Sequence, residues 1–342
     1  MKTESPTRVR AVAAGVAGFA AAAAATLAHS EAHAASAPPG EIVITGEKIF
    51  PESLTSSPDG HVIFGSIGQR AIYRANPGAA SADVWIEPGA DGLAGVFGVF
   101  ADPKSNTLWA CSGTPPFGPP PAGAPPPAPS ALHAFDLKSG APKGSYPLPT
   151  AGAFCNDIAV DSGGNAYATD TSNMEVVRLT KGGKALEVWA GNGSFGPKGG
   201  ILDGISVLGN RLFVNTLGTS KLFSVPIGSD GKAGSPVEVT LDRAISRPDG
   251  MRSFGKDKLL IIEGGNGGRL SKITLSANNG KVETVKEGYP DGPVAVTVVG
   301  TTAYVVEGQL AAMMGRRPGA PADTPPPQPK PFKATSAEVG KP

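Results

Sequence analysis

The chain has 342 residues and is close to electrically neutral, with 30 lysines and arginines against 29 aspartates and glutamates. That balance gives no electrostatic reason to expect a nucleic acid or an acidic membrane surface as a partner. Only 17% of the residues are charged and 6% are aromatic, whereas 47 are glycine, so the composition excludes coiled coils and helical bundles and favours a chain with many turns.

The first 34 residues have the pattern of a secretory signal peptide. Lys2, Arg8 and Arg10 give a positive start, an alanine-rich stretch without charge covers 11–28, and Ala32-His33-Ala34 offers small residues for cleavage. The alternative is an uncleaved anchor, although the alanine-rich stretch is only weakly apolar. We therefore expect export and a mature protein that is periplasmic or secreted, without membrane association.

Between residues 41 and 315 the sequence repeats a unit of two short strands joined by a turn, followed by further strands. The copies begin at Glu52, Val96, Asn156, Asp203, Asp249 and Gly292. Their spacing lies in the forties once a proline-rich loop insertion, residues 115–129, is set aside. A period in the forties with about four strands per repeat is typical of β-propeller blades. The sequence therefore predicts an all-β, six-bladed propeller over 41–315.

The two ends of the repeat region carry separate expectations. The β-rich segment Glu41–Thr45 precedes the first repeat without a blade of its own. Because an incomplete blade would expose an unpaired edge, we expect this strand to close the ring by pairing with the last blade; a loose N-terminal strand is the alternative. Residues 316–342 are rich in proline and are expected to form a disordered tail.

Oxygen-bearing side chains recur where the inner strands begin and where their partner strands end, and in a propeller these points meet at one mouth of the central channel. They are Glu52, Asn156, Asp157, Asp203, Asp249 and Asp291 at strand starts, and Ser66, Asp170, Asn215, Glu263 and Glu307 at strand ends. Crowded carboxylates repel one another unless a cation binds between them, and hard oxygen ligands suit Ca²⁺, Mg²⁺ or Mn²⁺. The alternative is that each Asp or Asn only makes a turn before glycine.

Four short motifs resemble the senescence marker protein/gluconolactonase (regucalcin-like) family, over about residues 47–310. They are Pro51-Glu52-Ser53, Cys155-Asn156-Asp157, Leu202-Asp203-Gly204-Ile205 and Pro248-Asp249-Gly250-Met251, the last followed by Asn266-Gly267-Gly268-Arg269. The resemblance implies a six-bladed propeller that holds one divalent cation in its channel, Ca²⁺ before Mg²⁺, Mn²⁺ or Zn²⁺. It also implies hydrolysis of sugar lactones and related esters.

By position, the resemblance implies that Glu52 and Asp249 are metal ligands and that Asp249 is also the general base for an attacking water. Asp203 stands where the family has a metal-binding asparagine, which adds a negative charge. Asn156 matches an asparagine that lies near the substrate and reaches toward the metal. Phe154 stands where the family has a sugar-recognising arginine, so we expect a less polar substrate or no lactonase activity.

The two cysteines, Cys111 and Cys155, fall at neighbouring strand ends of the second and third repeats. In an oxidising compartment a disulfide between them is one expectation, and two buried free thiols are the other. The chain has no Gly-x-Ser-x-Gly motif, so we expect no serine nucleophile.

Two functions follow from these observations. The favoured one is a monomeric, metal-dependent lactonase or esterase that acts on a small molecule. The alternative is a non-catalytic exported propeller that binds a small ligand or a protein partner, with its metal structural or absent.

Overall fold

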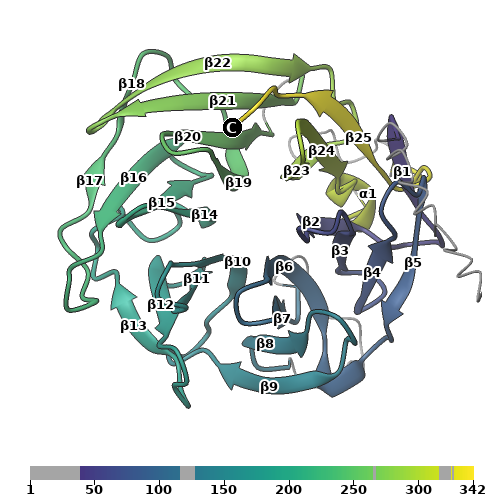
Figure 1. Ribbon diagram of the computed structural model, residues 1–342, viewed down its shortest axis with the longest axis horizontal. Coiled ribbons are helices and arrows are strands. Elements are labelled where there is room, and N and C mark those ends of the chain that lie inside the picture. The colour runs from purple at the N-terminus through teal and green to yellow at the C-terminus, as the bar shows by residue number, and fades with distance from the viewer. Residues whose placement is uncertain (1–38, 116–127, 265–266, 316–324, 326) are drawn as a thin grey trace, which may run out of the picture. The chain divides into compact units, whose positions relative to one another are not determined.

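The computed structural model describes residues 39–115, 128–264, 267–315, 325 and 327–342. Within the unit Ser36–Pro342, β-sheets follow one another around a central axis (Figure 1). The only helices in the described residues are α1 (Leu310–Met313) and the 3₁₀ turn η1 (Ala90–Gly92), and neither has the length and apolar character needed to cross a membrane. The all-β class predicted from the sequence is confirmed.

Three sheets contain four antiparallel strands each, in chain order. They are β6 (Gly95–Asp102), β7 (Thr107–Gly113), β8 (Ala131–Asp136) and β9 (Pro142–Pro147); β10 (Cys155–Val160), β11 (Ala166–Asp170), β12 (Glu175–Leu179) and β13 (Glu187–Ala190); and β14 (Leu202–Leu208), β15 (Arg211–Thr216), β16 (Lys221–Pro226) and β17 (Val237–Glu238). Tight turns join the strands. Between β14 and β15, for example, Gly209 has φ 63°, which a two-residue hairpin loop requires.

A fourth sheet has five strands. They are β19 (Pro248–Phe254), β20 (Lys258–Glu263), β21 (Arg269–Ser276), β22 (Asn279–Glu287) and β18 (Thr240–Leu241). The short strand β18 pairs in parallel with β22, so the chain crosses to the outer edge of this sheet before it enters the innermost strand.

An eight-stranded sheet joins the first and last repeats. In spatial order it contains β2 (Pro51–Ser56), β3 (Val62–Ser66), β4 (Ala71–Ala75), β5 (Ser81–Ile86), β1 (Glu41–Ile44), β25 (Lys333–Glu338), β24 (Thr302–Glu307) and β23 (Pro293–Val299). The N-terminal strand β1 pairs antiparallel with β25 and parallel with β5. The first and last strands of the described chain therefore lie side by side.

Strand β25 corrects one sequence prediction, because it lies in the segment expected to be a disordered tail. It pairs with β24 from Thr302 to Val306. Phe332, just before it, is buried and packs edge-on against Phe50 with ring centroids 5.2 Å apart. The proposed signal region 1–34, residues 116–127 of the proline-rich insertion, and residues 316–324 and 326 of the tail lie outside the described residues.

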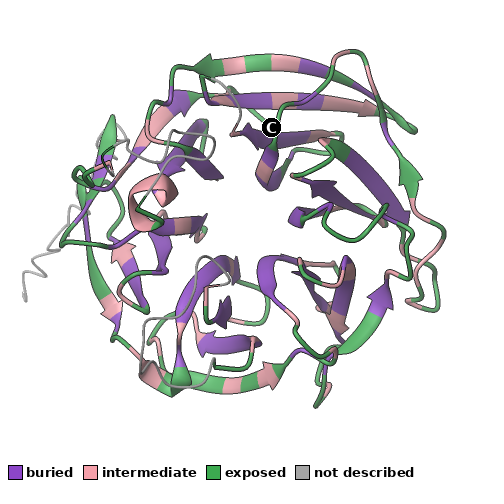
Figure 2. Cartoon of the chain, turned by 180° about the vertical axis from the view of Figure 1, so that it is seen from behind, coloured by how far each residue is buried: buried purple, intermediate pink, exposed green. Residues whose placement is uncertain are grey.

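The apolar core lies between neighbouring sheets. One cluster, for example, packs Phe213 and Leu222 of β15 and β16 against Met251, Leu259 and Ile261 of β19 and β20. Figure 2 shows buried residues concentrated on the inner strands, whereas outer strands such as β9 carry mostly exposed residues. The inner strands are therefore held rigidly around the axis.

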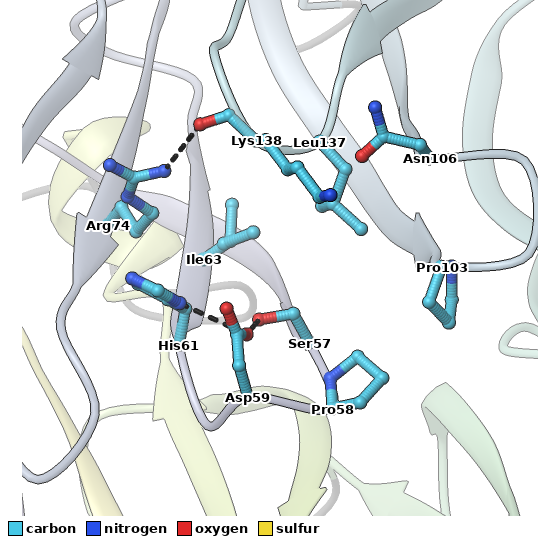
Figure 3. Close-up of a pocket in the computed structure, with 10 residues that line it drawn as sticks. All are labelled: Ser57, Pro58, Asp59, His61, Ile63, Arg74, Pro103, Asn106, Leu137 and Lys138. Carbon is cyan, nitrogen blue, oxygen red and sulfur yellow. Dashed lines mark hydrogen bonds and ion pairs between the residues drawn. The ribbon is translucent and has the colours of Figure 1, made fainter. Parts of the chain in front are cut away.

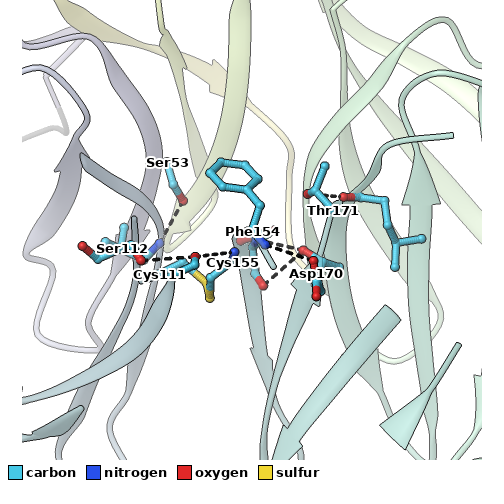
Figure 4. The surroundings of a disulfide bond; sticks show 12 residues. Ser53, Cys111, Ser112, Phe154, Cys155, Asp170 and Thr171 are labelled. Carbon is cyan, nitrogen blue, oxygen red and sulfur yellow. Dashed lines mark hydrogen bonds between the residues drawn. A yellow bond between two sulfur atoms is a disulfide. The ribbon is translucent and has the colours of Figure 1, made fainter. Parts of the chain in front are cut away.

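Cys111 on β7 and Cys155 at the start of β10 are joined by a disulfide, with their Cα atoms 5.1 Å apart (Figure 4). Both residues are buried. Beside the bond, the N–H of Cys155 donates to the hydroxyl of Ser130 at 2.8 Å. The disulfide links two neighbouring sheets.

We expect the double variant Cys111→Ala/Cys155→Ala to lose about 2–4 kcal/mol in free energy of unfolding. The reason is that the bond closes a loop between residues 44 positions apart, which gains freedom in the unfolded chain when the bond is absent. Urea denaturation followed by tryptophan fluorescence measures the loss. A reductant should destabilise the wild type by a similar amount and leave the double variant unchanged; equal stability of variant and wild type would contradict the prediction.

Candidate metal centre

Each innermost strand carries a register shift near its first residue. In β14, Leu202 pairs with Thr216 of β15, but the next pair is Ile205 with Val214, so Asp203 and Gly204 bulge out of the ladder. The same kind of shift occurs in β2, β6, β10, β19 and β23. Bulges re-aim side chains and are frequent beside functional sites. The first residues that they release are Glu52, Phe97, Asn156, Asp203, Asp249 and Val294.

Three of these side chains, those of Glu52, Asp203 and Asp249, meet. Each offers a carboxylate oxygen, and the three oxygens lie within 4.8 Å of one another. They come from β2, β14 and β19, strands that are far apart in the sequence. Asp203 is only 5% exposed, and the other two are partly buried. In the described part of the chain this is the one cluster of His, Cys, Asp or Glu side chains with such geometry.

The environment of the cluster raises the pKa of all three carboxyl groups. Burial is the largest cause in each case, and the negative charge of the neighbouring carboxylates, including Asp157, adds to it. The pKa of Asp249 rises to about 7, although the Gly250 N–H, which donates to its Oδ1 at 2.9 Å, works in the opposite direction. A bound cation would remove this repulsion.

Asn156 provides an independent sign that the cluster accommodates a cation. It is 5% exposed, and its amide hydrogen-bonds with Asp203. Its Oδ1 is buried and has no hydrogen-bond partner in the described structure. An unsatisfied buried carbonyl oxygen is costly, and a hard cation would satisfy it. Three carboxylates and one amide oxygen form a donor set that suits Ca²⁺, Mg²⁺ or Mn²⁺ better than Zn²⁺, so these residues fit a divalent metal.

Two residues fix the position of Asp249. Asn215, at the end of β15, donates from Nδ2 to the main-chain oxygen of Asp249 at 2.7 Å. Gly204 allows β14 and β19 to approach closely, because a Cβ at this position would lie 2.3 Å from that same oxygen. The glycine in the Asp203-Gly204 bulge is therefore required by the spacing of the two strands.

A buried ion pair, which the sequence pattern does not predict, lies beside the cluster. Nη1 of Arg252, on β19, lies 2.9 Å from Oδ2 of Asp157, on β10. Nη2 of Arg252 also donates to the main-chain oxygens of Val99 and Leu54, at 3.2 and 3.4 Å. Asp157 in turn accepts the N–H of Ile205 at 3.3 Å. These contacts join β2, β6, β10, β14 and β19, and the Arg252 charge acts to lower the pKa of Glu52.

Phe154, expected to face the substrate, packs in the apolar core. Its ring lies edge-on to Phe97 with centroids 4.6 Å apart, and its N–H donates to Asp170 Oδ1 at 3.0 Å. Figure 4 shows it next to Cys155 and the disulfide. A contact between Phe154 and substrate stays a prediction.

No protein-family model matches the chain, and no curated protein matches it. Several solved structures share its fold. They include a virginiamycin B lyase from Staphylococcus aureus (16% identity, TM-score 0.54, 87% of this chain and 98% of that one) and a gluconolactonase from Xanthomonas campestris (14%, 0.56, 84% and 86%). A PQQ-bound aldose sugar dehydrogenase from Streptomyces coelicolor is similar too (16%, 0.54, 88% and 99%). These likenesses show a β-propeller fold, and because three different activities use it, function must be argued from the site.

Without metal, we expect the protein to lose stability as the pH rises from about 4 to above 7. The folded protein keeps a proton on Asp249, whose pKa is raised to about 7, whereas the unfolded chain releases it near pH 4. Between these values the folded state binds more protons, so its free energy of unfolding falls with rising pH. Thermal unfolding at pH 5 and pH 8, with chelator or with Ca²⁺, measures the effect. Ca²⁺ should raise the Tm more at pH 8.

Two variants, one in the cluster and one outside it, isolate the contribution of the cluster to the pH dependence of stability. Asp257→Asn, an exposed change in the turn after β19, should keep the pH dependence of the wild type. Asp249→Asn should flatten it. A metal-free wild type whose pH dependence equals that of Asp249→Asn would contradict the prediction.

Proposed function

We propose that this protein is a metal-dependent hydrolase of the gluconolactonase (regucalcin-like) type, which acts on a lactone or a related ester. The observation that carries the proposal is the convergence of Glu52, Asp203 and Asp249 within 4.8 Å, beside the unsatisfied Oδ1 of Asn156. These four residues would hold one divalent cation, with Ca²⁺ preferred because every donor is a hard oxygen.

The architecture proposed for this enzyme is a six-bladed propeller. The eight-stranded sheet counts as two blades when it is divided between β5 and β1, and each of the other four sheets counts as one. On this count β1 is the outermost strand of the last blade, next to β25, and it closes the ring. Closure at this point removes an exposed edge from the sheet.

When bound, the metal would polarise a carbonyl group and make a water molecule more acidic. Asp249 acts as the general base: the Gly250 N–H orients its carboxyl group, and burial makes it a stronger base than an ordinary aspartate. It accepts the proton of the attacking water and returns it to the departing alkoxide. Asn156 orients the substrate oxygen next to the carboxylates.

The proposed substrate class follows from the residue two positions before Asn156. Phe154 stands there in place of the arginine with which the gluconolactonase family recognises sugars, and the loss of that charge favours a less polar lactone or ester than a sugar lactone. The similar virginiamycin B lyase is inactive when one of its histidines is replaced by alanine. In the described part of this chain no histidine joins the carboxylate cluster, which favours hydrolysis over that type of reaction. The proposal also includes export to the periplasm or medium and a monomeric state.

Metal analysis of the purified mature protein, together with a panel of lactones and aryl esters, tests the proposal. Hydrolysis of at least one compound should stop with chelator and return with Ca²⁺. Activity that survives chelation would contradict it. Metal binding without turnover would instead support a non-catalytic exported propeller that binds a small ligand or a protein partner.

A further inference from the structure

A pocket of about 350 Å³ lies at the opposite ends of the strands from the carboxylate cluster, between the β2–β3 turn and the β8–β9 turn (Figure 3). Part of its lining is apolar and includes Ile63 and Leu137. The rest carries three basic side chains, those of His61, Arg74 and Lys138. The pocket therefore combines an apolar surface with a concentration of hydrogen-bond donors.

Arg74 is held in a fixed direction. Its guanidinium lies over the ring of Trp85, 4.1 Å from the centroid, and its Nη1 donates to the main-chain oxygen of Lys138 at 3.4 Å. Stacking on an aromatic ring and a hydrogen bond across two sheets leave the remaining N–H groups of Arg74 available to a ligand. Because the side chain is already ordered, binding would cost little conformational entropy.

Lys138 is also positioned by its main chain. Its N–H donates to Asp136 Oδ1 at 3.1 Å, while its carbonyl accepts from Arg74. The ammonium group makes no ion pair or hydrogen bond within the described residues, and Figure 3 shows its nitrogen end among the lining side chains. A positive charge without a partner therefore lines the same pocket as Arg74, with its nitrogen end toward Leu137 and apart from the Arg74 guanidinium.

Asp59 is the one carboxylate among the lining residues, and its neighbours already engage it. It accepts a hydrogen bond from the hydroxyl of Ser57, and its Oδ1 lies 3.1 Å from Nδ1 of His61. Since Asp59 takes Nδ1, the other ring nitrogen of His61 is the one left for a ligand. The lining thus has two full positive charges, those of Arg74 and Lys138, against the one negative charge of Asp59.

We propose that this pocket binds a small organic anion, a carboxylate or a phosphate monoester on an apolar body about the size of a benzene ring. The anionic group lies between Arg74 and Lys138, where the Arg74 fork and the Lys138 ammonium both donate to it. The apolar body packs on Ile63 and Leu137. This site is separate from the proposed hydrolytic centre and does not depend on it.

Isothermal titration of the metal-free protein with phenyl phosphate, benzoate and neutral benzyl alcohol tests the proposal. Both anions should bind, with benzyl alcohol at least 10-fold weaker. Lys138→Met and Arg74→Met should each weaken anion binding at least 10-fold, Arg74→Lys should weaken it less, and Asp59→Asn should strengthen it. Lys138→Met stays informative if Arg74→Met fails to fold, because the lysine ammonium has no partner to lose.

Lys104→Met is the matched control, since this lysine is exposed and follows the lining residue Pro103 without lining the pocket itself. It should leave both affinities unchanged. Three results would overturn the proposal: no binding of either anion, equal binding of benzyl alcohol, or equal losses in Lys104→Met and Lys138→Met. A preference between phenyl phosphate and benzoate identifies which anionic group the site accepts.

Discussion

Replacing Asp249 by asparagine is expected to abolish hydrolysis while making the metal-free protein more stable. The change removes the general base and one metal ligand, so kcat/KM should fall by about 10³-fold or more. It also removes one of three carboxylates that repel one another. Because the pKa of Asp249 is raised from 3.8 to about 7, the metal-free variant should gain up to about 4 kcal/mol in free energy of unfolding at pH 8.

Three measurements separate this prediction from simple damage to the fold. Steady-state kinetics reports the loss of activity, urea denaturation in chelator reports the gain in stability, and the Tm shift with Ca²⁺ should disappear. Asparagine can still accept the Gly250 N–H, so the bulge should persist. The exposed variant Asp257→Asn should match the wild type in all three measurements. An Asp249→Asn protein that is less stable without metal, or that still responds to Ca²⁺, would contradict the proposed centre.

The repeat pattern allowed much of the site to be anticipated, because residues at equivalent positions of a repeat return to the same end of the ring. Glu52, Asp203 and Asp249 were placed together by this reasoning, and the structure brings their oxygens within 4.8 Å. The prediction needed no knowledge of strand register. It needed only that each inner strand starts at the same mouth.

The position of the Arg252 side chain could not be predicted in this way, because a bulge breaks the alternation of side chains along a strand. In β19, Pro248 pairs with Glu263 and the next pair is Met251 with Ile261. The face on which each later residue lies therefore cannot be counted from Asp249 by a period of two. The available signal was an arginine inside an inner strand, next to the apolar Met251.

Strand β25 was not predicted from the sequence for a different reason. Its sequence, Lys-Ala-Thr-Ser-Ala-Glu, has little β-branched or aromatic character and follows a proline-rich segment. Its order comes from partners that are distant in the sequence: β24 on one side and β1 on the other. A local sequence pattern cannot predict a strand whose order depends on pairing with distant segments.

The Arg252–Asp157 ion pair and the neighbouring carboxylate cluster have different electrostatic roles. Arg252 is bound to both oxygens of Asp157, at 3.2 and 2.9 Å, so its charge is matched one to one. The cluster of Glu52, Asp203 and Asp249 has no comparable partner bonded to it in the described residues, and its carboxyl pKa values remain raised. The ion pair is therefore expected to stabilise the inner strands, and the cluster is the part whose charge the proposed metal would balance.

Arg252→Met is accordingly expected to lower the free energy of unfolding by about 3–5 kcal/mol, because it leaves Asp157 buried and without its counter-ion. The side chain also connects strands of several sheets through Val99 and Leu54, so its loss loosens the ring. Urea denaturation in chelator measures the change.

The double variant Arg252→Met/Asp157→Asn should recover part of the loss, since no uncompensated charge remains buried. Lys256→Met, an exposed change on the β19–β20 turn, should alter stability by less than about 0.5 kcal/mol. If the double variant were as unstable as the sum of the two single variants, the arginine would act through packing alone, and the ion pair could not be what holds the inner strands together.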